Sequence, residues 1–195
     1  MFEIEMDFRE FDKIKNILNE KTFNKAVVRT LNRVANAGFT AGSKKIREEY
    51  NIKARDIKKA SKIRKATFND QRVILTISGG SIPFKYFGAK QTKKGVTVKI
   101  KRYGPRILVK HAFIGGYIPK RKGRSYKMVK VSNWGGGHVY IRKGKARLPI
   151  VKLAATSVTI PKLFASDKVI AAIESRVGEI AGEEFVRNLK FYAKV

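Results

Sequence analysis

The sequence QRVILTISGG at residues 71–80 carries apolar side chains at every second position, at Val73, Leu75 and Ile77. This period is typical of a half-buried β-strand, and the paired glycines after it indicate a turn. The same segment opens a stretch, ending at Ser166, that contains 22 Lys and Arg and no Asp or Glu. We therefore predict a basic, β-rich region in the middle of the chain.

Alternation continues along this basic stretch. In GVTVKIK (95–101), Val96, Val98 and Ile100 alternate with other side chains, and residues 139–142 repeat the pattern. Glycine-containing turns separate the strands that these patterns predict. The region is therefore expected to fold as an antiparallel sheet and not as a disordered basic tail.

The segment between Gly115 and Gly137 is the least regular part of the basic stretch. It holds six glycines and a cluster of basic residues at 120–124. Long glycine-containing loops in compact domains are usually functional or disordered. We predict a loop here that contributes to a binding surface.

The residues before the basic stretch carry a helical pattern. Val27, Leu31 and Val34 recur at a spacing of three to four residues, which predicts a long helix over about 23–50. Three shorter elements are also predicted: a strand at 2–6, a helix from about 11 to 20 and a basic helix at 52–60.

One face of the long predicted helix carries the small residues Ala35, Gly38, Ala41 and Gly42. Small side chains allow another backbone to approach closely. Two interpretations stay open: the face packs in the core of the chain, or it contacts another subunit. These four residues are our candidates for an oligomer interface.

The residues after Pro161 return to a helical pattern. Ser166 can cap a final helix, in which Ile170, Ile173 and Val177 form a stripe. The whole pattern predicts an α+β fold, in which a basic antiparallel sheet or partial barrel packs against the long N-terminal helix and the C-terminal helix. We predict one domain over 1–195, with a helical part at 1–61, a basic β-rich part at 62–160 and a C-terminal helix at 161–195.

The chain has 195 residues and a formal net charge of +29, far more than solubility requires. One interpretation is a solvated basic face, and the other is a surface for a polyanion, either nucleic acid or an acidic protein. Interleaved aromatic residues either stack on bases or pack in the core. The candidate nucleic-acid-binding residues are Lys93, Lys94, Lys99, Lys101, Lys120, Arg121, Lys122, Arg124, Arg142, Lys143, Lys145 and Arg147.

The sequence carries no signal for a metal or catalytic site. There is no cysteine, and the histidines are His111 and His138 alone, so the usual zinc ligand sets are missing. A nuclease would gather carboxylates around Mg²⁺, and the basic stretch has none. We expect no enzyme activity, cofactor, metal or small-molecule substrate. The acidic N-terminus is unlike a signal peptide, and no apolar run approaches the roughly 20 residues that span a bilayer. We therefore expect a soluble protein without a membrane partner.

Several segments in the same order resemble the minor tail protein Z family of long-tailed phages and prophages, over about residues 20 to 190. They are YNIKARDI (50–57), SGGSIP (78–83), QTKKGVTVKI (91–100), AFI (112–114) and RKGKARLPI (142–150).

The resemblance implies a structural virion protein that acts in tail completion at the head-proximal end of the tail. It implies a location in the virion tail, with assembly in the host bacterial cytoplasm. The partners it implies are other tail proteins, the viral DNA end and copies of the chain itself, with a ring of six expected from closed symmetry. It supplies no catalytic residues. The alternative that stays open is a sequence-independent nucleic-acid-binding module of the ribosomal or RNA-processing type.

Overall fold

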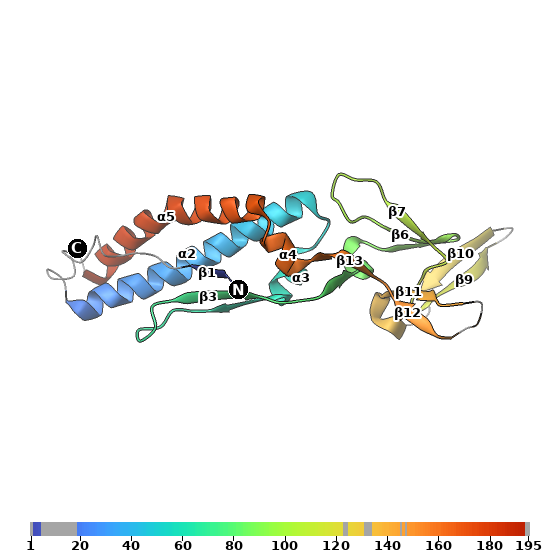
Figure 1. The fold of residues 1–195 in the computed structure, drawn as a ribbon, viewed down its shortest axis with the longest axis horizontal. Coiled ribbons are helices and arrows are strands. Elements are labelled where there is room, and N and C mark those ends of the chain that lie inside the picture. Colours follow the sequence, from blue (N-terminus) through green and yellow to red (C-terminus); the bar gives the residue numbers. More distant parts are fainter. Residues whose placement is uncertain are drawn as a thin grey trace. The chain divides into compact units, whose positions relative to one another are not determined.

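The structure is a computed structural model that describes residues 2–4, 19–122, 125–130, 134–144, 146 and 148–193. Its long helices and short antiparallel strands (Figure 1) confirm the predicted α+β class. The chain divides into two units. Unit 1 comprises Met1–Lys45, Lys58–Ser78 and Leu163–Val195, and unit 2 comprises Ile46–Ile57 and Gly79–Lys162.

The long N-terminal helix is α2, which spans Glu20–Glu49 and confirms the prediction. The side chain of Asn19 caps it by accepting a hydrogen bond from the backbone N–H of Lys21 over 2.9 Å. The predicted stripe is the buried face, because Val27, Leu31 and Val34 are at most 3% exposed. The helix predicted at about 11–20 lies outside the described residues, apart from its last two positions.

The C-terminal helix is α5, Asp167–Ala193, which follows the short helix α4, Ile160–Phe164. Ser166, which was predicted to cap the final helix, directly precedes α5. Its hydroxyl donates to the Leu163 carbonyl over 2.9 Å, and its carbonyl accepts hydrogen bonds from the backbone N–H groups of Val169 and Ile170 in the first turn of α5. The serine therefore closes the end of α4 with its side chain and begins α5 with its backbone.

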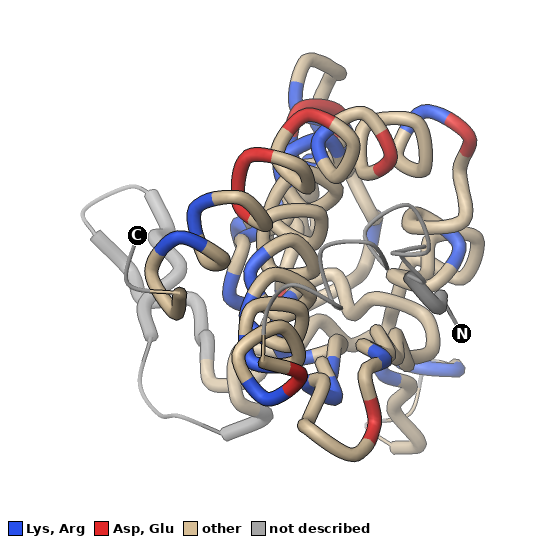
Figure 2. Tube along the Cα trace, turned by 90° about the vertical axis from the view of Figure 1, so that its left-hand side faces the viewer, with Lys and Arg blue, Asp and Glu red and all other residues tan. Residues whose placement is uncertain are grey.

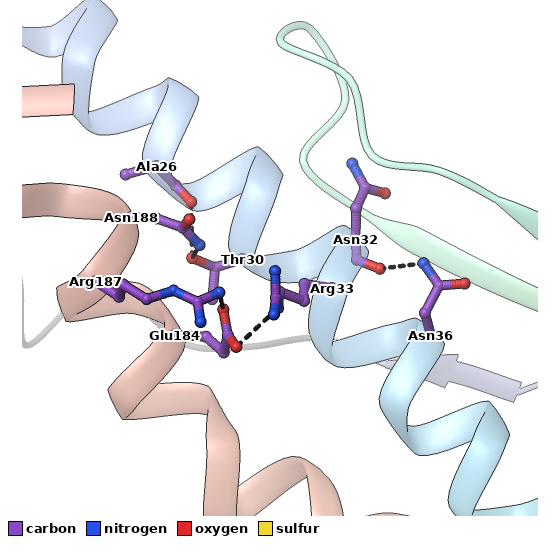
Figure 3. A network of polar contacts seen from close by, with 8 residues as sticks. All are labelled: Ala26, Thr30, Asn32, Arg33, Asn36, Glu184, Arg187 and Asn188. Atoms are coloured by element: carbon purple, nitrogen blue, oxygen red, sulfur yellow. Dashed lines mark hydrogen bonds and ion pairs between the residues drawn. The ribbon is translucent and has the colours of Figure 1, made fainter. Parts of the chain in front are cut away.

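Helices α2 and α5 contact each other through a polar network (Figure 3). Thr30 and Asn188 are fully buried and hydrogen-bonded to each other. Nearby, the Arg33 Nε lies 2.8 Å from the Glu184 carboxylate, which also pairs with Arg187. These contacts set how one helix lies along the other.

Unit 1 also contains a three-stranded antiparallel sheet in the order β1-β3-β2. Its strands are β1 (Phe2–Ile4), β2 (Ser61–Arg64) and β3 (Val73–Ile77). Val73 of β3 joins Val27, Leu31 and Phe185 in one buried apolar cluster. The two long helices therefore share their core with this small sheet.

Unit 2 contains the remaining strands. They are β4 (Ser81–Pro83), β5 (Lys90–Thr92), β6 (Gly95–Val98), β7 (Ile107–Lys110), β8 (Phe113–Ile114), β9 (Tyr117–Lys122), β10 (Ser125–Lys130), β11 (Val139–Arg142), β12 (Ile150–Lys152) and β13 (Ala154–Thr159). The other elements are the short helix α3 (Ala54–Lys59), which begins in this unit, and the 3-10 turns η2 (Phe84–Phe87) and η3 (Trp134–Gly137).

The described strands of unit 2 form four small antiparallel sheets and no closed barrel. Their orders are β10-β9, β12-β11-β8, β13-β4 and β5-β6-β7. The alternation of apolar residues correctly predicted strands, but it does not show which strands pair with each other. The basic region is therefore divided among small sheets and is not one continuous sheet.

The segment between Gly115 and Gly137 was predicted as a loop, and this prediction was wrong for its backbone. It contains the hairpin β9–β10, in which Ile118 pairs with Val129 and Lys120 with Lys127. The many basic residues obscured the β propensity of residues such as Tyr117, Ile118 and Val129. Pairing between the two halves of the segment satisfies backbone groups that a loop would leave to water.

Candidate functional site

The positive charge is concentrated in unit 2. This unit carries 24 Lys and Arg against three acidic residues, a net charge of +21, whereas unit 1 carries 20 against 12. All three acids of unit 2 lie at Glu48, Glu49 and Asp56, so residues 79–162 contain none. Figure 2 marks the Lys and Arg positions in blue and the Asp and Glu positions in red along the described trace.

The predicted basic residues that the structure describes lie mostly in contact with solvent. Lys93 and Lys94 are exposed in the turn between β5 and β6. Lys99 is half-buried and Lys101 is exposed, just beyond the other end of β6. These lysines therefore flank opposite ends of one strand and do not form a single cluster.

The other predicted basic residues belong to different elements. Arg142 and Lys143 are exposed at the end of β11, where the guanidinium of Arg142 lies 5.8 Å from the centre of the Phe113 ring. Lys120, Arg121 and Lys122 belong to strand β9. Arg124, Lys145 and Arg147 lie outside the described residues.

Two arginines that we did not predict hold parts of unit 2 together. The guanidinium of Arg106 donates to the carbonyl oxygens of Gly88 and Thr97 and to the Thr97 hydroxyl. It therefore ties the start of β7 to β6 and to the end of η2. Only the contacts could identify this role, because Arg106 resembles its neighbours in the sequence.

Arg102 contacts the C-terminal end of α2. Its side chain donates to the carbonyl of Arg47 over 3.0 Å, and its backbone N–H donates to the carbonyl of Glu49 over 2.8 Å. The last carbonyls of a helix have no partner within the helix and carry partial negative charge, which suits an arginine. Lys101 lies 3.9 Å from the Glu49 carboxylate. Arg102 and Lys101 therefore interact with groups inside unit 2.

Asp70 and Asp56 lie beside arginines. Asp70 in unit 1 pairs with Arg64 over 2.7 Å and with Arg72 over 3.0 Å. Asp56 in unit 2 lies 3.8 Å from Arg55. Within the described part of the chain, no group of three or more His, Cys, Asp or Glu could hold a metal ion.

The two histidines have different surroundings. His111 is exposed after β7 and has a positive φ of 59°. His138 is half-buried before β11, and burial, together with the charges of Lys85 and Lys152, lowers its pKa below the usual 6.5. A neutral imidazole beside two lysines adds no charge to the basic surface of unit 2.

The small-residue face of α2 packs inside unit 1. Ala35, Gly38 and Gly42 are buried, and Ala41 is half-buried. A Cβ added at Gly42 would lie 2.8 Å from Ile173 Cδ1 and 3.1 Å from Phe164 Cε1, so this glycine allows close packing with α4 and α5. Contact of this face with another subunit stays a prediction.

The comparisons with known proteins concern the chain as a whole. No helix in the described residues is long and apolar enough to cross a membrane. No curated protein and no solved structure matches the chain. The model of one family, prophage minor tail protein Z, matches residues 11–194. This match covers nearly the whole chain, and by it the chain belongs to the prophage minor tail protein Z family.

Proposed function

We propose that this minor tail protein acts in tail completion at the head-proximal end of the tail, and that the basic surface of unit 2 contacts DNA or the tail tube. The observation that carries the proposal is the absence of any acid from residues 79–162, which leaves unit 2 with a net charge of +21. Such a field attracts a polyanion over a distance and favours contacts that do not depend on sequence.

The exposure of the basic side chains supports this proposal. Lys90, Lys93, Lys94 and Lys143 are all exposed, and residues 79–162 offer them no carboxylate partner. Surface lysines bind phosphates as point charges without reading bases. A viral DNA end, or the acidic wall of a tail tube, needs this kind of recognition.

Family membership and symmetry support the partners that we propose. As a member of a tail protein family, the chain interacts with other tail components in the virion tail. Copies of the chain form a ring of six, because tail ends are symmetric and closed rings satisfy all of their interfaces. Assembly takes place in the cytoplasm of the host bacterium. Ala35, Gly38, Ala41 and Gly42 are the candidate contacts between copies.

The location of the protein in the cell tests this function. A nuclease-treated lysate of producing cells is fractionated on a density gradient, and the chain is followed by immunoblot. If the chain acts in the tail, it migrates with tail particles. Migration with ribosomes, or release as free protein by nuclease alone, would contradict it and favour a ribosomal or RNA-processing module.

A second test addresses the basic residues of the segment 120–124. Replacing Lys120, Arg121, Lys122 and Arg124 together by Gln is expected to leave folding intact and to lower infectivity or DNA retention. Circular dichroism checks the fold, and plaque counts check function. Unchanged infectivity would contradict a role for this segment.

A further inference from the structure

The outer edge of strand β7 has backbone groups that no described strand pairs with. β7 lies at the end of the sheet β5-β6-β7 and pairs with β6 alone, so that Val96 lies opposite Val109 and Thr97 opposite Leu108. In the same register, the His111 N–H donates to the Lys94 carbonyl over 3.3 Å.

The register defines which groups of β7 point outward. In an antiparallel ladder, pairs that exchange hydrogen bonds alternate with pairs that do not. Because His111 bonds to β6, the backbone groups of Val109 and Ile107 also face β6, and those of Leu108 and Lys110 face away from it. Such a row of outward N–H and C=O groups can pair with another strand.

The apolar face of the same sheet is only partly covered at this edge, where Val109 is half-buried. Val96 and Val98 are completely buried, whereas Ile107, which lies opposite Val98, is 51% exposed. Residues directly opposite each other share a face of the sheet. A strand added outside β7 would therefore bury the Ile107 side chain. On the other face, Leu108 is 38% exposed.

The charge around the outer edge of β7 determines which kind of strand can bind there. Arg106 directly precedes β7 and Lys110 ends it, and both are exposed; residues 79–162 offer no acid. A basic strand, including β7 of a second copy, would be repelled, whereas an acidic strand would be attracted. DNA could contact these basic side chains but has no peptide backbone to pair with Leu108 and Lys110.

We propose that β7 is a docking edge for an extended acidic segment of another protein. The segment adds as a fourth strand to β5-β6-β7, bonds to the outward groups of Leu108 and Lys110, and places an apolar side chain against Ile107. This interaction does not depend on how the basic surface contacts DNA or the tube.

Residue-resolved amide hydrogen exchange on the full chain tests the proposal, with a short synthetic peptide of alternating Val and Glu as the probe. In the free protein, we expect the amides of Ile107 and Val109 to exchange slowly and those of Leu108 and Lys110 to exchange fast. The peptide is expected to slow exchange at Leu108 and Lys110 by about tenfold or more. Unchanged exchange at these two amides, or protection by a DNA duplex and not by the peptide, would overturn the proposal.

Two matched variants show whether the effect belongs to this edge. Ile107→Glu places a negative charge where the peptide must pack, and it is expected to abolish the protection. Val151→Glu makes the same kind of change on β12, the outer strand of another sheet, where Val151 is 39% exposed. This control is expected to keep the protection. If both variants lose the protection equally, net charge alone attracts the peptide, and the proposal is wrong.

Discussion

The side-chain amide of Asn188 in α5 donates a hydrogen bond to the hydroxyl oxygen of Thr30 in α2 over 3.0 Å (Figure 3). Both residues are buried, with 2% and 0% of their surfaces exposed. The Thr30 hydroxyl in turn donates to the carbonyl of Ala26 over 2.8 Å. A buried polar pair is costly when broken, so this bond favours one register of α5 along α2.

Thr30→Val is expected to destabilise the chain by about 1–3 kcal/mol, because it leaves the buried amide of Asn188 without its acceptor. Valine has almost the same shape as threonine, so packing changes little. Urea unfolding followed by circular dichroism measures the loss.

The double variant Thr30→Val/Asn188→Leu serves as the control. Replacing both partners removes the unsatisfied donor, so the pair is expected to cost less than the sum of the single changes. Strict additivity would show that the hydrogen bond does not couple the two helices.

The period of apolar residues was enough to predict the helices. In α2, the predicted stripe of Val27, Leu31 and Val34 is the buried face. In α5, the predicted residues Ile170, Ile173 and Val177 are half-buried, and the buried apolar residues are Val169 and Phe185. Alternation likewise predicted β3 and β6. Periodicity reflects which face of an element is buried, and this information is local.

The contacts of the candidate site could not be predicted in the same way. Arg106 and Lys93 are alike in the sequence, but Arg106 bonds to Gly88 and Thr97, whereas Lys93 is exposed in a turn. Whether a basic side chain bonds within the unit or stays exposed depends on which carbonyl groups the fold brings close to it. Charge counts therefore predicted a basic surface but not which of its members hold the unit together.

The glycine at position 42 gives a test of close helix packing. Alanine is favoured over glycine within a helix by up to about 1 kcal/mol. At Gly178 of α5 a Cβ would meet nothing within 4 Å, but at Gly42 it would meet Ile173 and Phe164. We expect Gly178→Ala to stabilise the chain and Gly42→Ala to be less stable than Gly178→Ala by about 1 kcal/mol or more. Thermal unfolding of both variants measures the difference, and equal gains would contradict tight packing at Gly42.

The backbone at Gly95 also requires glycine. Its φ is +149°, and an added Cβ would lie 2.1 Å from the carbonyl oxygen of Val109. Gly95→Ala is therefore expected to cost about 1–3 kcal/mol by pushing β6 from β7. Gly144→Ala, where a Cβ would meet nothing within 4 Å, should be nearly neutral. A chemical denaturation series compares the two, and a neutral result at Gly95 would contradict the close approach.

The lowered pKa of His138 predicts a dependence of stability on pH. Burial and the charges of Lys85 and Lys152 disfavour the protonated imidazole in the folded chain. The unfolded chain binds the proton near the ordinary pKa of about 6.5, so it takes up protons first as the pH falls. The contribution of the neutral His138 side chain to the free energy of unfolding is therefore fully present above the ordinary pKa and is lost on acidification. His138→Gln is expected to lose less stability than the parent between pH 7 and pH 5. Parallel stability curves for the two proteins, measured by urea unfolding, would rule this out.

The exposed lysines of unit 2 predict how DNA binding responds to salt. Each lost phosphate contact lowers the slope of log affinity against log salt by about 0.9 for duplex DNA. Replacing Lys90, Lys93, Lys94 and Lys143 by Gln should weaken binding and flatten this slope. The matched control replaces Lys58, Lys59, Lys62 and Lys65, which are also exposed but belong to unit 1, and so removes the same net charge. If unit 2 carries the contacts, the control keeps most of the slope, because counterion release depends on the phosphates touched and not on total charge. Equal flattening in both variants, measured by fluorescence anisotropy across a salt series, would mean that DNA binds the whole chain without preference.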